Sequence, residues 1–262
     1  MTASTHRGGS GEPLVLVHGF LDTWRTWELV LPALERRHDV LVPTLAGHAG
    51  GPPLREPPDA EALVDPLEQA LDEAGFGTAH VAGNSLGGYL ALRLAERGRA
   101  RSVVAFAPAG GWRLGDPDHE ARFVQQRGVY RLAREFEAHA DEIASTVEGR
   151  RRVTLYTTEQ FEHIPADLIA HQIRGVAHCD GAEALLDVGL ADEWTLEPER
   201  IDCPVRIVWG LADKVLPWPS ATVRYREWLP QAEWIELDDV GHCPQLDVPA
   251  VTADLILGVS DR

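Results

Sequence analysis

The stretch AHVAGNSLGG, residues 79–88, decides the fold of this chain. It begins as an apolar strand, turns at the pentapeptide GNSLG (83–87) and continues into the helix-forming run 89–95. A strand, a sharp turn and a helix around a central serine are typical of a nucleophile elbow, in which the turn holds the serine in strained backbone geometry. Glycine is required at positions 83 and 87 because the strand and the helix approach closely there. We therefore predict that Ser85 is a nucleophile; the alternative is an inert serine in a glycine-rich turn.

A second apolar strand leads into a His-Gly pair. Residues 14–20 read LVLVHGF, and such a continuous apolar run suits the centre of a parallel sheet. Acyl transfer requires backbone N–H groups that point at the developing oxyanion, and the loop after this strand is a natural source of one. We assign the two donors to the N–H groups of Phe20 and Leu86. His18 is interpreted as a packing histidine that holds the loop by hydrogen bonds, not as the catalytic base.

The base and its carboxylate partner are expected in two later loops. Asp213 lies in a loop at the carboxyl end of the predicted strand 205–209, and sites in open parallel sheets lie at that edge. His242 follows the predicted strand 234–237 and can take the Ser85 proton and return it to the leaving group. Asp213 would accept from the imidazole and fix its tautomer. The competing carboxylates are those of Asp238, Asp239 and Asp116.

Four motifs carry a resemblance to a known family. They are HGF at 18–20, GNSLGG at 83–88, GLADKVLP at 210–217 and GHCPQLDVP at 241–249. With them, the chain resembles the α/β-hydrolase superfamily, in the branch of single-domain serine hydrolases with a helical lid. The resemblance implies that nucleophile, acid and base follow in that order along the chain, that no metal or organic cofactor is needed, and that His48 stabilises a loop near the site.

Strands and helices alternate along the chain, as expected for a mostly parallel, doubly wound α/β sheet. Strands are expected at 14–17, 39–43, 80–83, 102–106, 205–209 and 234–237, and helices at 24–36, 60–74, 86–97, 220–229 and 249–257. Only about a dozen residues precede the first of these strands. We therefore expect the amino-terminal antiparallel hairpin of the family to be absent or abbreviated.

A long segment separates the strands 102–106 and 205–209 and far exceeds one crossover helix. We predict a hydrolase core formed by residues 1–110 and 200–262, with residues 111–199 inserted as a helical lid. Helices within the lid are expected at 119–146, 150–158 and 165–177. The run GRRR at 149–152 is more typical of a solvated helix face than of an anion site.

Eight tryptophans are many for 262 residues, and their distribution predicts a pocket with aromatic walls. The expected substrate-binding residues are Trp24, Trp112, His178, Trp194 and Trp218. Ordinary packing between helices and sheet is the alternative for any single tryptophan. An aromatic wall favours a small hydrophobic acyl or aryl substrate over a polyanionic metabolite.

The composition argues against several other classes of protein. A formal net charge of -17 argues against nucleic acid as a partner and against binding to anionic membrane surfaces. The scattered cysteines, Cys179, Cys203 and Cys243, predict neither a disulfide framework nor a metal site. The first residues lack the apolar core of a signal peptide, and no later segment has about 18 unbroken apolar residues, so we expect a cytoplasmic protein.

The predicted activity is hydrolysis of a carboxylic ester of a small hydrophobic substrate through a Ser85 acyl-enzyme. Serine at this position argues against the dehalogenases and epoxide hydrolases of the superfamily, which use an aspartate nucleophile. One alternative is a hydrolase that cleaves a carbon–carbon bond of a diketone-type ring-cleavage product. Another is a slow-turnover ligand receptor of the same fold, and the oligomeric state stays open.

Overall fold

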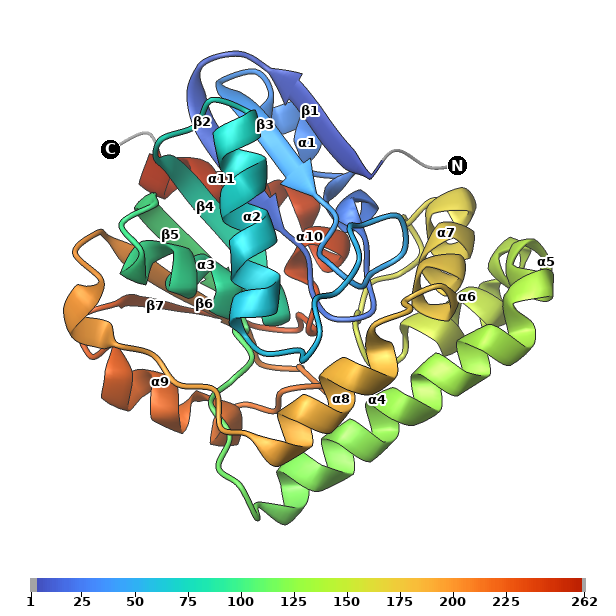
Figure 1. Cartoon of the computed structure of the whole chain (residues 1–262). Coiled ribbons are helices and arrows are strands. Elements are labelled where there is room, and N and C mark those ends of the chain that lie inside the picture. The colour runs from blue at the N-terminus through green and yellow to red at the C-terminus, as the bar shows by residue number, and fades with distance from the viewer. Residues whose placement is uncertain (1–3, 261–262) are drawn as a thin grey trace.

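The computed structural model describes residues 4–260, and within them a seven-stranded sheet forms the centre of the molecule (Figure 1). The strands run in the order β1-β3-β2-β4-β5-β6-β7. Their bounds are β1 (Thr5–Gly9), β2 (Glu12–Val17), β3 (His38–Pro43), β4 (Ala79–Asn84), β5 (Ala100–Phe106), β6 (Val205–Gly210) and β7 (Glu233–Leu237). β1 pairs antiparallel with β3, and the other pairings are parallel. The predicted mostly parallel α/β sheet is confirmed.

The antiparallel strand β1 is an element that the sequence pattern does not predict. Its sequence, THRGG, has no large apolar side chain, and its residues are exposed or only half-buried at the edge of the sheet. Polar residues of this kind protect an edge strand against pairing with other chains, and they also remove the apolar signal by which strands are recognised. Within the described residues the amino-terminal antiparallel part is thus abbreviated to one strand, as expected.

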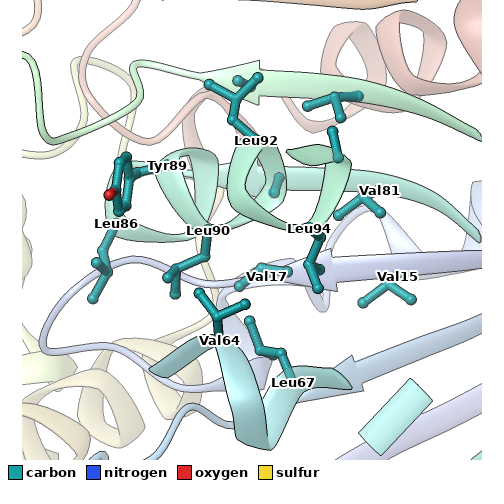
Figure 2. Close-up of a cluster of buried hydrophobic side chains, with 14 of the residues drawn as sticks. Val15, Val17, Val64, Leu67, Val81, Leu86, Tyr89, Leu90, Leu92 and Leu94 are labelled. Atoms are coloured by element: carbon teal, nitrogen blue, oxygen red, sulfur yellow. The ribbon is translucent and has the colours of Figure 1, made fainter. Parts of the chain in front are cut away.

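Helices cover both faces of the sheet. The helices α2 (Glu61–Glu73), α3 (Leu86–Glu96) and α9 (Val223–Trp228) pack on one face, and the 3-10 helix η1 (Trp24–Trp27), α1 (Leu31–Leu34) and α11 (Pro249–Ser260) pack on the other. Successive residues of a strand point to opposite faces. Val15 and Val17 of β2 therefore lie with Leu90 and Leu94 of α3 in one cluster (Figure 2), whereas Leu14 and Leu16 belong to the cluster on the opposite face.

The predicted helix 24–36 is wrong in its extent. The structure divides this segment into η1 and α1, with residues 28–30 between them. Pro32 lies in the first turn of α1, where its fixed φ suits a helix start and its missing N–H cannot continue the preceding turn. The predicted helix 220–229 likewise begins as a 3-10 turn, η4 (Ser220–Thr222), before α9.

A helical insertion lies between β5 and β6. Its helices are α4 (Pro117–Phe136), η2 (Glu137–His139), α5 (Ala140–Ser145), α6 (Val147–Thr154), α7 (Ala166–Ala177) and α8 (Ala182–Ala191). Figure 1 shows these helices grouped along one side of the molecule. The predicted helix 119–146 is wrong as a single unit because three elements share that stretch, and α8 is an additional helix that the sequence analysis missed.

Three further features concern the described residues as a whole. None of their helices is both long and apolar enough to cross a membrane. No group of three or more histidine, cysteine or acidic side chains in residues 4–260 is arranged to hold a metal ion. The cysteines Cys179, Cys203 and Cys243 are all free thiols.

Candidate active site

Ser85 occupies a strained turn between β4 and α3. Its backbone angles are φ 56° and ψ -118°, in a region that residues with a side chain rarely adopt. A Cβ added at Gly83 would lie 2.1 Å from the carbonyl oxygen of Gly87, and one added at Gly87 would lie 2.1 Å from that of Val17. The two glycines are therefore required by close backbone approach, which is the geometry of a nucleophile elbow.

His242 is held by a buried carboxylate. Its Nδ1 lies 2.7 Å from Oδ2 of Asp213, and both side chains are almost completely buried. The other oxygen, Oδ1, accepts from the backbone N–H groups of Val215 and Leu216, each at 2.8 Å. The carboxylate is thus fixed by the loop after β6, and an Nδ1–H that donates to it leaves Nε2 of His242 as the acceptor.

The competing carboxylates have other places in the structure. Asp116 caps α4 by accepting from the N–H of Asp118. Asp239 lies in the loop after β7 with a positive φ of 55°. Of the carboxylates weighed in the sequence analysis, Asp213 is the one bonded to the His242 ring.

Ser85 and His242 both line a cavity of about 740 Å³, and Phe20 and Leu86 line it as well. A Cβ added at Gly19 would lie 3.3 Å from Cβ of Ser85, so the loop that carries Phe20 runs directly beside the serine. Leu86 is the first residue of α3, and its N–H has no carbonyl one turn earlier in the helix to bond. These positions place both predicted oxyanion donors around the Ser85 side of the cavity.

Asn84 connects the elbow to the loop that carries His242. Its Nδ2 donates to the carbonyl oxygen of His242 at 2.8 Å, and its Oδ1 accepts from Nε2 of Gln245 at 3.1 Å. The side chain is nearly fully buried, so these bonds have little competition from water. Asn84 thereby sets the distance between the serine turn and the histidine loop, a role that the sequence analysis missed although it quoted the residue within its motif.

Asp247 connects the helical insertion to the same loop. Its carboxylate accepts from the N–H of Gly241 at 2.6 Å, and also from the N–H groups of Glu159 at 3.0 Å and Gln160 at 2.6 Å. The side chain is buried, and three charge-assisted hydrogen bonds on one carboxylate are individually stronger than neutral ones. The sequence signal was available, because Asp247 belongs to the quoted GHCPQLDVP motif, but its partners come from a segment far away in the chain.

Two histidines near the serine have structural roles. Nε2 of His18 accepts from the N–H of Leu45 at 2.9 Å, and its Nδ1 lies 2.7 Å from the carbonyl oxygen of Gly19. Burial holds the pKa of His18 well below its usual value, and burial lowers the pKa of His48 to about 4. Both rings are therefore neutral near pH 7 and support the loops beside Phe20, as the sequence analysis predicts for them.

The structure places two of the five expected substrate-binding residues in the cavity wall. Trp112 and Trp194 line the cavity, and their ring centroids lie 5.5 Å apart. The other three do not line this cavity. Trp24 stacks on His6, Trp218 lies under the guanidinium of Arg226, and His178 is an exposed residue paired with Glu137.

Cys243 follows His242 directly in the chain and lines the cavity, but its thiol is not expected to be reactive. Burial raises the pKa of this thiol well above its usual value, and the neutral S–H donates to Oδ1 of Asn84 at 3.4 Å. A thiol held in its neutral form is a poor nucleophile, so Cys243 acts as a small packing residue.

Comparisons with known proteins identify the family to which the chain belongs. A family model described as the alpha/beta hydrolase fold matches residues 12–249. The epoxide hydrolase EphH of Mycobacterium tuberculosis is 32% identical over 207 residues, covering 74% of this chain and 91% of that protein. The pimeloyl-[acyl-carrier protein] methyl ester esterase of Aromatoleum aromaticum is 31% identical over 271 residues, covering 93% of this chain and 96% of that protein.

A solved structure supports the same fold. The enol-lactonase from Burkholderia xenovorans superimposes with a TM-score of 0.77 at 19% identity, covering 98% of this chain and 96% of that chain. Together with the family model and the sequence relatives, the architecture identifies the chain as a member of the α/β-hydrolase family.

Proposed function

We propose that this α/β hydrolase is a serine hydrolase that cleaves carboxylic esters of small hydrophobic substrates, with Ser85, His242 and Asp213 as its catalytic triad. The observation that carries the proposal is the joint position of the three residues. A strained serine and an imidazole open on one cavity, and a buried carboxylate holds the imidazole. The relative named as a methyl ester esterase supports an ester as the substrate class.

The first half of the reaction forms the acyl-enzyme. His242 takes the Oγ proton of Ser85 on Nε2 while Oγ adds to the ester carbonyl carbon. The imidazolium is stabilised by Asp213, and the N–H groups of Phe20 and Leu86 bind the oxyanion, each contributing very roughly 3 kcal/mol to the lowering of the barrier. The tetrahedral intermediate collapses as its bond to the leaving oxygen breaks, and the leaving alcohol receives the proton from His242.

The second half releases the acid. Water loses a proton to His242 and attacks the carbonyl carbon of the acyl-enzyme, and the same two N–H groups bind the second oxyanion. The bond to Ser85 then breaks, the carboxylic acid leaves, and His242 returns the proton to Oγ. Every proton is passed through His242, so the cycle needs no group beyond the chain and water.

The cavity wall supports a hydrophobic substrate. Apolar side chains from the insertion line it together with Phe20, among them Val129, Ile143, Ile169 and Ile173. Trp112 and Trp194 add aromatic surface that suits an acyl or aryl group. We propose that residues 111–199 act as a lid over this cavity and that residues 1–110 and 200–262 form the core.

The decisive experiment combines covalent labelling with turnover. A fluorophosphonate probe should add to Ser85, detected as a mass increase on the peptide 79–88, and the purified protein should hydrolyse p-nitrophenyl esters with an optimum of acyl length. Ser85→Ala should lose both. Ser145→Ala, a matched change at an exposed serine of α5, should lose neither.

Different failures would point to different functions. Parental ester hydrolysis by folded Ser85→Ala would refute the serine mechanism. Because one relative is named an epoxide hydrolase, the panel includes a small aryl epoxide, and sustained opening of this epoxide without ester hydrolysis would refute the esterase proposal. Labelling of Ser85 without ester turnover would favour cleavage of a carbon–carbon bond in a diketone, or ligand reception.

A further inference from the structure

Asp22 is a carboxyl group in the cavity wall that the catalytic cycle does not use. It lies two residues after Phe20, in the loop beside the serine. Its side chain accepts from the backbone N–H of Thr23 at 2.8 Å, and the side chains of Thr26 and Gln172 lie near enough to lower the pKa of its carboxyl. Gln172, on α7, lines the same cavity.

The hydrogen bond from Thr23 does not saturate the carboxylate. An ionised carboxylate offers about four acceptor positions, and the N–H of Thr23 occupies one of them. Asp22 itself lines the cavity, so a bound molecule can reach its carboxylate there. The same cavity wall also contains the apolar side chains of Leu21, Ile169 and Ile173. A carboxylate among them would offer a bound molecule a hydrogen bond of defined direction.

Asp22 is held rigidly relative to Ser85. Thr26, whose side chain lies near the Asp22 carboxyl, accepts on Oγ1 from Nε2 of Gln245 at 3.1 Å, and the same Nε2 donates to Asn84. Thr26 and Gln245 are fully buried, so these contacts connect the surroundings of Asp22 to the elbow through the protein interior. A polar group fixed in this way can recognise a substituent at a defined distance from the reacting carbonyl.

The charges around Asp22 favour a neutral donor on the ligand. In residues 4–260 no ion pair to Asp22 is formed, and burial raises the pKa of its carboxyl to about 6. Two titratable groups beside this loop, the thiol of Cys243 and the ring of His171, which bonds Thr23, are kept neutral near pH 7 by burial. The wall of the same cavity also carries the ionisable side chains of Asp116, Asp118, His119, Arg122, Arg152 and His242. A ligand ammonium carries three donors and would leave two unpaired against the apolar wall, whereas a hydroxyl group needs one acceptor.

We propose that Asp22 and Gln172 form a polar subsite that binds a hydroxyl group of the substrate close to the reacting carbonyl, so that the preferred substrates are hydroxy-substituted carboxylic esters. This inference rests on the proposed ester hydrolysis at Ser85. The substrate O–H donates to the free acceptor position of Asp22, and the Gln172 side chain lies beside the same point of the wall. A site built to bond a hydroxyl group discriminates strongly against the analogue that lacks it, because its own polar group is then left unpaired.

The test compares matched esters that differ by one hydroxyl group. Methyl esters of 2-, 3- and 4-hydroxy acids are each paired with the unsubstituted ester, and a hydroxyalkyl ester of the plain acid is paired with its alkyl ester. In the parent protein at least one pair should favour the hydroxy ester by about tenfold or more in kcat/KM. Asp22→Leu and Gln172→Leu should bring that ratio close to one, and Asp22→Asn should reduce it.

The controls separate this subsite from the proposed function. Asp116→Asn, a change of another carboxyl group in the cavity wall, should keep the parental ratio. The proposed function is tested separately, by fluorophosphonate labelling of Ser85 and hydrolysis of plain esters in the parent protein. In the parent protein the ratio should also rise from about pH 5 to about pH 7.5 as Asp22 ionises, and in Asp22→Asn it should stay flat. The titration of His242 is common to both esters and cancels in the ratio.

Each outcome has one meaning. Hydrolysis of plain esters with no preference in any hydroxy pair overturns the subsite and leaves the serine hydrolase intact. A preference that Asp22→Asn and Asp22→Leu both retain also overturns it. Absence of ester hydrolysis altogether, with Ser85 unlabelled, overturns the proposed function and the subsite with it.

Discussion

Asp22 makes a prediction about stability that is independent of any substrate. Burial raises the pKa of this carboxyl from its ordinary value of 3.8 to about 6 in the folded protein, because burial disfavours the charged form more than the neighbouring polar groups favour it. The folded state therefore holds the proton more tightly than the unfolded state. Asp22 contributes stability that is fully present below about pH 4 and is lost as the pH rises through about 6.

The size of the effect follows from the two pKa values. A difference of 6 - 3.8, or about 2 pKa units, corresponds to about 3 kcal/mol of unfolding free energy between the acid and neutral limits. Between about pH 4.5 and pH 7.5, where both states can be measured, about 2 kcal/mol of this should be observed. Asp22→Asn removes the titration while keeping the size of the side chain.

The assay is urea unfolding of the parent protein and Asp22→Asn at a series of pH values. Many other carboxylates titrate in this range, but they are common to both proteins, so the difference between the two free energies isolates Asp22. The stability of Asp22→Asn relative to the parent should increase by about 2 kcal/mol from about pH 4.5 to about pH 7.5. A flat difference, or one that decreases with pH, would refute the buried, raised-pKa state of Asp22.

Three further predictions follow from the site. Asp247→Ala leaves three backbone N–H groups without their acceptor, so it should lower the unfolding free energy by about 3 kcal/mol or more and reduce kcat. An unfolding free energy in urea within about 1 kcal/mol of the parent value, together with a nearly parental kcat, would contradict this. Gly83→Ala places a Cβ 2.1 Å from a carbonyl oxygen and should abolish fluorophosphonate labelling, whereas Gly77→Ala, which meets nothing within 4 Å, should label at the parental rate. Because burial raises the pKa of its thiol, Cys243 should resist a disulfide reagent in the native protein at about pH 8 and react once urea unfolds the chain. Rapid modification of Cys243 in the native protein would exclude a packing role.

The sequence predicts the parts of this molecule whose signals are local. The elbow, the Asp213 loop and the His242 loop each combine an apolar strand with a turn at its carboxyl end, and the parallel sheet brings the three ends to one edge. Local signals fail to predict two other features. Pro32 divides one predicted helix into two elements, and the polar strand β1 forms by pairing with the edge of β3.

The composition of the cavity wall depends on contacts between distant segments. Trp24 and Trp218 are as apolar as Trp112, yet Trp24 stacks on His6, Trp218 lies under Arg226, and neither lines the cavity. The surroundings of Asp22 include Gln172 of α7 and, through Thr26, Gln245 of the short helix α10 (Pro244–Asp247), so no local sequence pattern predicts the proposed subsite. Residues of this kind are found from the fold and not from a motif.

The contacts of Asp247 have a consequence for how this protein could be re-engineered or could have diverged. Residues 157–163 belong to the insertion, yet they bond the segment that follows β7. The N–H of Glu159 donates to Asp247, and the carbonyl oxygen of Thr157 accepts from the N–H of Cys243 at 2.8 Å. Nε2 of His163 bonds the carbonyl oxygen of Leu246 at 2.8 Å. A graft that replaced the whole insertion with one from a relative would therefore also replace the contacts that support His242, the proposed general base. Chimeras that keep residues 157–163 from this chain should retain a working imidazole, and exchange of substrate preference should be confined to the helices on either side of that segment.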